Sequence, residues 1–122
     1  MEESEKAYMI DIDGVVCEDV PNEFPELMVT AKEITGAKEW VNSKFDSGAH
    51  ICFFTARTEA HRDITETWLR SHGFKFHQII YGKPRHKKYH YVDNQHVQAT
   101  TFKGRFSPLI TKSAGIEVFE SD

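Results

Sequence analysis

The sequence predicts an α/β protein, with a Rossmann-like three-layer α/β/α sandwich built on a mainly parallel sheet. Short apolar runs typical of buried strands alternate with segments of helical periodicity, and glycines follow the helical segments. Strands that alternate with single helices form right-handed crossover units, in which the strands run parallel. Ligands of such sheets bind beyond the carboxyl ends of the strands, so we expect the functional side chains there.

The first half of the chain begins with a continuously apolar run at 7–11, which predicts a buried strand. Residues 14–35 have no clean period and contain two prolines, so we expect an ordered loop with a hairpin or a turn of helix. Apolar residues at helical spacing then predict a helix over 37–45, which ends before Gly48.

The second half continues the alternation. We expect strands at 50–54, 76–81 and 89–93, with a helix over 58–72 between the first two. Residues 115–119 are a further candidate for an edge strand.

Length and composition predict a single domain over residues 1–122. No run approaches the roughly 20 apolar residues of a membrane span, and the acidic N-terminus lacks the pattern of a signal peptide. Cys17 and Cys52 are too few for a disulfide scaffold and lie in apolar surroundings. We therefore expect reduced thiols in a cytoplasmic protein that has no membrane partner.

Charge is unevenly distributed. Residues 1–33 hold ten acidic residues and two lysines, whereas the remainder holds thirteen Lys and Arg and nine acidic residues, for a net charge of −4. Nucleic-acid-binding proteins usually present a dominant basic face, so nucleic acid is not the expected main partner.

Polar side chains follow every predicted strand. Asp11 and Asp13 end the first strand, and Gly14 allows the sharp turn that lets both carboxylates converge. Thr55 ends the second strand and Lys83 the third. Asp93 and Asn94 end the fourth. An isolated Asp-x-Asp-Gly is equally compatible with an acidic turn, and polar residues commonly begin loops, but the ordered set indicates one shared site.

This set resembles the motifs of the haloacid dehalogenase-like phosphohydrolase superfamily over about residues 7–104. The matching motifs are Asp11-Ile12-Asp13-Gly14-Val15-Val16, Phe53-Phe54-Thr55-Ala56-Arg57, Gly82-Lys83-Pro84 and Tyr91-Val92-Asp93-Asn94. The superfamily often has two acids in the fourth motif, where this chain has a single acid followed by Asn94.

The resemblance implies a Mg²⁺-dependent phosphatase that forms an aspartyl-phosphate. It implies that Asp11 is the nucleophile and that Asp13 is the general acid and base, with a backbone carbonyl on the metal. Thr55 and Lys83 would bind the phosphoryl oxygens, and Asp93 would complete the metal site with Asp11 and Asp13.

The substrate is expected to be a phosphomonoester of a small metabolite, because the layout is most similar to small capless hydrolases of bacterial surface polysaccharide and sugar-phosphate metabolism. Arg57, Arg85 and Asn94 are candidates for binding the rest of the substrate. The intervals between the motifs leave no room for a cap domain. An open site implies either a large substrate or a homo-oligomer in which a neighbouring subunit closes it.

Three alternatives remain open at this point. A signalling receiver domain also places acids, a Thr and a Lys at strand ends, but its acid pair and phosphorylated Asp come in a different order. A nucleic-acid end phosphatase would use an open site, but the chain lacks an aromatic and basic stacking platform. A non-catalytic relative could bind phosphorylated molecules without turnover.

Overall fold

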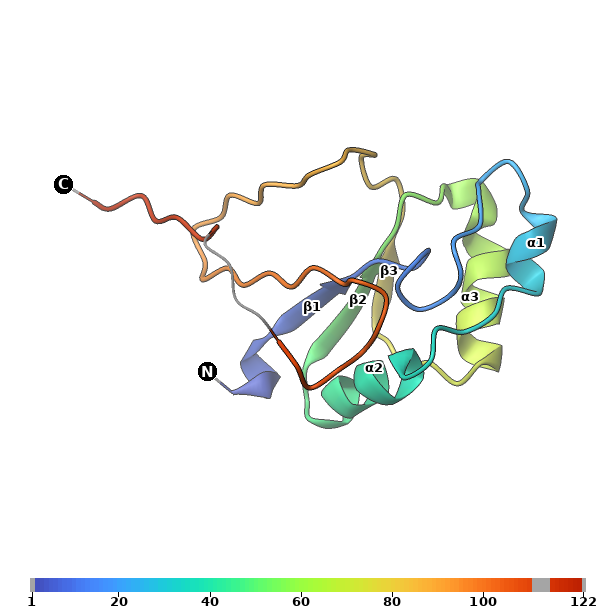
Figure 1. The fold of residues 1–122 in the computed structure, drawn as a ribbon, viewed down its shortest axis with the longest axis horizontal. Helices are drawn as coiled ribbons and strands as arrows, with labels where there is room; N and C mark the ends of the chain where they lie inside the picture. Colours follow the sequence, from blue (N-terminus) through green and yellow to red (C-terminus); the bar gives the residue numbers. More distant parts are fainter. Residues whose placement is uncertain (1, 111–114, 122) are drawn as a thin grey trace.

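A three-stranded parallel sheet forms the centre of the protein in the computed structural model, which describes residues 2–110 and 115–121 (Figure 1). Its strands are β1 (Ala7–Ile10), β2 (His50–Phe54) and β3 (Gln78–Ile80), in the order β1-β2-β3. Both strand pairs are parallel. The strands predicted at 7–11, 50–54 and 76–81 are therefore confirmed.

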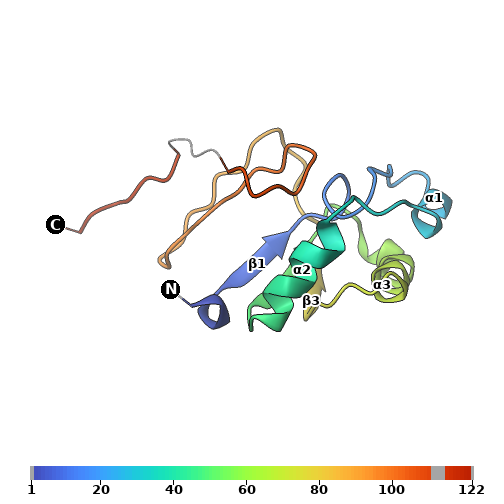
Figure 2. The same cartoon turned by 60° about the horizontal axis from the view of Figure 1, so that its bottom comes forward.

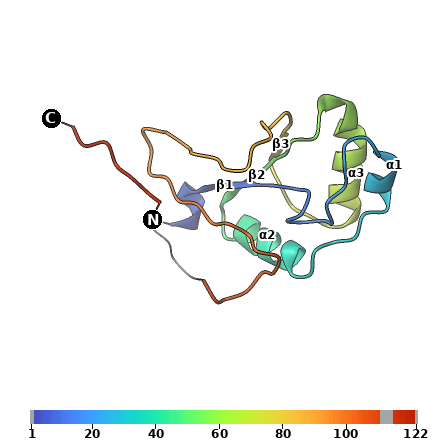
Figure 3. The same cartoon turned by 45° about the horizontal axis from the view of Figure 1, so that its top comes forward.

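Two helices connect the strands. Helix α2 (Ala37–Asp46) lies between β1 and β2, and α3 (Arg62–Ser71) lies between β2 and β3, as the periodicity predicted. The short helix α1 (Glu26–Val29) is the helical turn expected in the long loop, and it packs against α3 (Figure 3). Two single 3₁₀ turns, Glu3–Glu5 and Glu59–His61, precede β1 and α3.

The hydrophobic core lies between the sheet and these helices. Right-handed crossovers that advance in one direction place α2 and α3 on the same face of the sheet. Figure 2 shows α2 against the strands on this side. Phe53 of the central strand is fully buried and packs edge-on against Phe74 and Phe76. Other buried residues of the core are Ile10, Ile12, Val16, Met28, Val41, Ile51, Trp68 and Leu69.

The opposite face of the sheet is more open. Met9 on β1 is 50% exposed and Ile80 on β3 is 38% exposed, whereas Cys52 on the central strand is buried. In the described part of the chain, no helix covers this face, since α1 packs on α3. The structure therefore has a small α/β fold with an open parallel sheet that is compatible with a Rossmann-like arrangement, and a three-layer sandwich is not confirmed.

The segment after β3 differs from the prediction. Residues 89–93 and 115–119 are exposed and form no strand, so both strand predictions are wrong. The Tyr89 side chain folds back on its own loop: its hydroxyl donates to the Pro84 carbonyl and accepts from the His86 N–H. Further along, Phe106 packs on Trp40 of α2, with ring centroids 5.5 Å apart.

No helix in the described ranges combines the length and apolar character needed to cross a membrane.

Candidate functional site

A cavity of about 220 Å³ lies where the segments that follow all three strands meet. Its lining includes acidic residues from the segment after β1 and basic residues from the segment after β3. Because parallel strands end at one edge of the sheet, the fold brings these distant segments together. The lining residues are Asp11, Asp13, Asp19, Val20, Pro21, Ala56, Lys83, Arg85, His86 and Tyr89.

Asp11 and Lys83 lie next to each other in the lining of this cavity. The Lys83 ammonium lies 3.9 Å from Asp11 Oδ2, and Asp11 Oδ1 accepts a hydrogen bond of 2.9 Å from the Ile12 N–H. The Lys83 N–H donates to the Thr55 carbonyl at 2.9 Å, which fixes the start of the loop after β3. The Lys83 ammonium also lies 4.5 Å from the centroid of the Tyr89 ring. The two predicted residues therefore meet, with opposite charges.

Burial raises the pKa of the Asp11 carboxyl above its ordinary value, and the positive charge of Lys83 opposes this shift. The neighbouring charges of Asp13 and Asp19 add to the rise. The negative charge of this carboxylate is only partly offset by Lys83. The carboxylate is therefore available to a cation or to an electrophilic phosphorus atom.

Asp13 also borders the cavity, but its carboxylate is held by Arg57. Arg57 Nε donates to Asp13 Oδ2 at 3.0 Å, and Arg57 Nη2 donates to Asp13 Oδ1 at 2.8 Å. This is the bidentate geometry in which a guanidinium binds a carboxylate most strongly. Gly14 makes the turn that permits it, with a φ of 84°.

Arg57 faces the interior, which corrects the expectation that it reads the substrate. Its side chain is only 2% exposed, and its remaining guanidinium nitrogen, Nη1, donates to the Thr65 hydroxyl at 3.0 Å. Asp13, Thr65 and the Cys17 sulfur therefore all accept from the guanidinium. Arg57 joins the turn after β1 to helix α3 and holds Asp13 in place.

Thr55 is placed behind the cavity. It is fully buried, and its hydroxyl accepts the Arg57 N–H at 3.1 Å. The lining of the cavity includes the next residue, Ala56, and not Thr55. The structure therefore gives Thr55 a role in shaping the turn after β2, in place of the phosphoryl contact that the sequence suggested.

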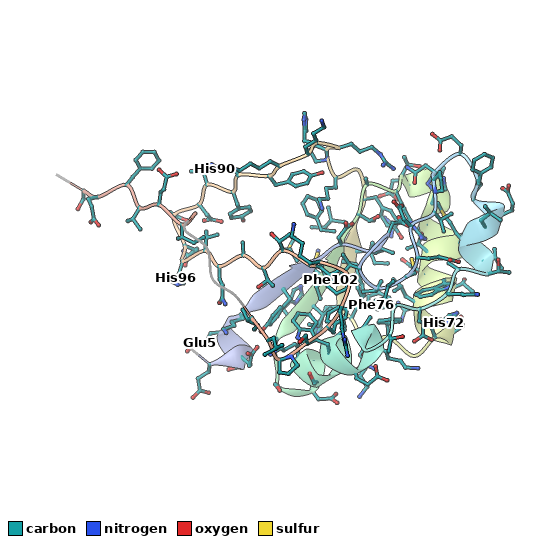
Figure 4. All side chains as sticks on the ribbon, viewed as in Figure 1. Glu5, His72, Phe76, His90, His96 and Phe102 are labelled. Carbon is teal, nitrogen blue, oxygen red and sulfur yellow. The ribbon has the colours of Figure 1, made fainter. Side chains whose placement is uncertain are left out.

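Asp93 and Asn94 lie outside the cavity, which corrects their expected places in the site. Asp93 accepts hydrogen bonds from the Tyr91 hydroxyl at 2.8 Å and from the Gln95 N–H at 3.0 Å. The Tyr91 hydrogen bond lowers the pKa of Asp93. Figure 4 shows His90 and His96, which bracket this stretch, on the extended segment that leads away from the sheet. Because residues 89–93 form no strand, the sheet does not carry Asp93 to the strand ends.

Asp19 takes part in the site although the sequence reasoning did not single it out. It lies in the loop after β1, lines the cavity, and its charge contributes to the raised pKa of Asp11. The loop has no periodic pattern from which its path could be predicted. The concentration of acidic residues in the first part of the chain was the one available signal.

The oxygen donors of the cavity suit a hard cation that keeps much of its own hydration. Among residues 2–110 and 115–121, no three His, Cys, Asp or Glu side chains form a metal-binding group. The cavity instead offers the carboxylates of Asp11 and Asp19. Mg²⁺ is commonly held by one or two carboxylates, with water and a substrate phosphate as its other ligands. This donor set fits Mg²⁺ and does not fit a metal that needs a complete protein cage.

Comparisons with known proteins support the fold alone. No protein-family profile matches the chain, and no curated protein matches it either. A solved structure described as an MCSG target from Vibrio cholerae is similar, with a TM-score of 0.55 and 20% sequence identity. The match covers 72% of this chain and 79% of the Vibrio cholerae chain.

Replacing Lys83 by Gln is expected to raise the pKa of Asp11 further, since the ammonium is the largest influence that lowers it. The folded protein then binds a proton to Asp11 over a wider pH range than the unfolded chain does. Stability therefore falls as pH rises from the unfolded pKa of Asp11 to its folded pKa, and this window is wider in the variant. Carboxyl ¹³C NMR titration measures the shift directly.

Lys75→Gln is the matched control, because Lys75 pairs with Asp46 on the surface. An Asp11 pKa that is the same in the native protein and in Lys83→Gln would contradict the proximity of the two charges.

Proposed function

We propose that this chain is a Mg²⁺-dependent phosphatase that hydrolyses a phosphomonoester, such as a sugar phosphate or a related small metabolite. The observation that carries the proposal is the pair formed by the partly buried Asp11 carboxylate and the Lys83 ammonium, 3.9 Å apart in a cavity at the strand ends. A carboxylate nucleophile beside a cation is the arrangement needed to attack a dianionic phosphate.

In the proposed first step, an oxygen of Asp11 attacks the phosphorus atom and the bond from phosphorus to the ester oxygen breaks. The leaving oxygen takes up a proton and departs as an alcohol. Asp11 then carries the phosphoryl group as an acyl phosphate. A water molecule attacks the phosphorus, gives up a proton, and releases inorganic phosphate with the Asp11 carboxylate restored. Lys83 offsets the charge of the phosphoryl oxygens throughout.

Asp13 is the proposed carrier of the proton, and its pairing with Arg57 leaves room for that role. Asp13 Oδ2 accepts the Arg57 Nε–H at 3.0 Å and keeps a second lone pair that can take part in proton transfer. Its position beside Asp11 in the cavity supports the assignment. Arg57 acts here as a positioning residue that holds the Asp13 carboxylate towards the cavity.

Mg²⁺, when bound, would reduce the repulsion between the phosphate dianion and the acidic side of the cavity. Asp11 and Asp19 are the carboxylates that would hold it, together with the Asp13 carbonyl. This set replaces the one with Asp93, which lies outside the cavity.

The proposal includes the architecture that the motifs suggest. A Rossmann-like sandwich would have a third layer on the face where Met9 and Ile80 are exposed. The resemblance to the haloacid dehalogenase-like superfamily is the reason for proposing that layer and a single catalytic domain.

The direct test is phosphate release from p-nitrophenyl phosphate, with Mg²⁺ and with EDTA. We expect turnover with Mg²⁺, loss of turnover with EDTA, and recovery when Mg²⁺ is added in excess, because the acidic cavity repels an unshielded phosphate. Added Na⁺ at equal ionic strength is the control for simple screening. Turnover that is unchanged by EDTA would contradict the metal requirement, and absence of phosphate release from a panel of phosphorylated metabolites would contradict the enzyme assignment.

A further inference from the structure

The cavity contains basic side chains beyond the one that the proposed chemistry uses. Arg85 and His86 line it together with Lys83. Lys83 already has a carboxylate partner in Asp11. Across the described residues, the ion pairs include neither Arg85 nor His86. Within the described fold, these two side chains are therefore not engaged in an ion pair.

The loop that carries these residues is organised around Tyr89. The Tyr89 hydroxyl donates to the Pro84 carbonyl, and the His86 N–H donates to the same hydroxyl at 3.2 Å. The Tyr89 ring also lies under the Lys83 ammonium. One side chain therefore ties together both ends of the short basic loop, which keeps Arg85 and His86 at the rim of the cavity.

The basic residues of the lining offer two anion-binding positions. Next to Asp11, a phosphoryl group would meet Lys83. A second anion would meet Arg85 and His86, which also line the cavity. Val20, Pro21 and Ala56 add uncharged parts to the lining. A guanidinium binds carboxylate and phosphate groups through two parallel hydrogen bonds, which makes Arg85 the stronger candidate of the two.

We propose that the substrate carries a second anionic group on the part that leaves, and that Arg85, assisted by His86, binds it. This inference rests on the proposed phosphatase function and specifies its substrate class. A cavity of about 220 Å³ accommodates a small molecule with two anionic groups. The class is therefore small phosphorylated hydroxy acids or small bisphosphates, in which a carboxylate or a second phosphate provides the same negative charge.

The test compares 3-phosphoglycerate with glycerol 3-phosphate, which differ by a carboxylate in place of a hydroxymethyl group, and adds 1,3-propanediol bisphosphate as the bisphosphate probe. We expect kcat/KM to be about tenfold higher for at least one of the two bis-anionic probes, since a charge-assisted pair contributes about a factor of ten. The kcat/KM values for these two probes, compared with each other, identify which anion the site prefers. In Arg85→Gln, the ratio of kcat/KM for the bis-anionic probe to kcat/KM for glycerol 3-phosphate should fall to near one.

Lys87→Gln is the matched control, because Lys87 belongs to the same basic loop and does not line the cavity. The Lys87→Gln variant should keep the native preference for the bis-anionic probes over glycerol 3-phosphate. Equal kcat/KM for all three probes, or a preference that Arg85→Gln leaves intact, would overturn the second anion site while leaving the phosphatase proposal standing.

A binding measurement separates the two proposals. Calorimetric titration of the metal-free protein with 3-phosphoglycerate and with the bisphosphate needs no turnover. If no probe releases phosphate but the affinity for either bis-anion falls about tenfold in Arg85→Gln, the anion site stands and the phosphatase proposal fails. If native protein and Arg85→Gln bind both bis-anions equally, the anion site is excluded whatever the activity.

Discussion

Asp11→Asn is expected to reduce phosphate release by at least about 1,000-fold, because the amide cannot form the acyl phosphate. The substitution keeps the size of the side chain and the hydrogen bond that the Ile12 N–H donates to this position. It also removes a carboxylate whose pKa is raised by burial, so the variant should be at least as stable as the native protein at neutral pH. A loss of activity would then be separate from any loss of folding.

Asp46→Asn supplies the matched control for this substitution. Asp46 is an exposed acid on α2 that pairs with Lys75, far from the proposed chemistry in the fold. Phosphate release from p-nitrophenyl phosphate should be unchanged in this control, and circular dichroism should give the same folded spectrum for both variants. Turnover that survives in Asp11→Asn at near-native rates would remove the nucleophile assignment and with it the aspartyl-phosphate.

Arg57→Met is expected to lower the free energy of unfolding by about 3 kcal/mol. Removing one partner of a buried ion pair leaves the other charge without compensation, and such changes typically have effects of this size. Arg57 is 2% exposed and the Asp13 side chain is 17% exposed, so Asp13 keeps some contact with water. The Thr65 hydroxyl also loses its donor. Urea unfolding measures the difference.

The double variant Asp13→Asn with Arg57→Met tests whether the pair is the cause. We expect the double variant to be more stable than Arg57→Met alone, since the uncompensated carboxylate is gone. Arg62→Met is the control, because Arg62 forms exposed pairs with Glu59 and Glu66 and should change stability by less than about 1 kcal/mol. Equal losses in Arg57→Met and Arg62→Met would contradict the importance of the buried pair.

The sequence predicted the elements whose signals are local. The apolar runs of β1, β2 and β3 and the periodicity of α2 and α3 each lie within one short segment, and each element is present near its predicted bounds. The arrival of Asp11 and Lys83 at the same edge of the sheet was also predictable, because parallel strands end at one edge. This pairing joins residues far apart in the sequence and depends on topology alone.

What the sequence could not provide was the direction of individual side chains. Arg57 follows a strand end just as Lys83 does, yet it turns inward because Asp13 and Thr65 satisfy its guanidinium. The apolar residues before Asp93 suggested a strand. However, the Tyr89 hydroxyl donates a hydrogen bond within its own loop, and residues 89–93 pair with none of the described strands. Asp19 lies in an aperiodic loop, so its arrival at the cavity follows from the path of that loop.

The basic loop between Lys83 and Tyr89 begins directly after Gly82, whose φ of 80° is a conformation that most other residues avoid. On the acidic side, the buried Arg57 clamps Asp13 to the body of the fold. The basic loop is tied in turn by the Lys83 N–H, which donates to the Thr55 carbonyl, and by the Tyr89 hydroxyl, which donates to the Pro84 carbonyl. Both walls of the cavity are therefore anchored by hydrogen bonds before a ligand arrives, so a dianion meets charged groups whose positions are already set.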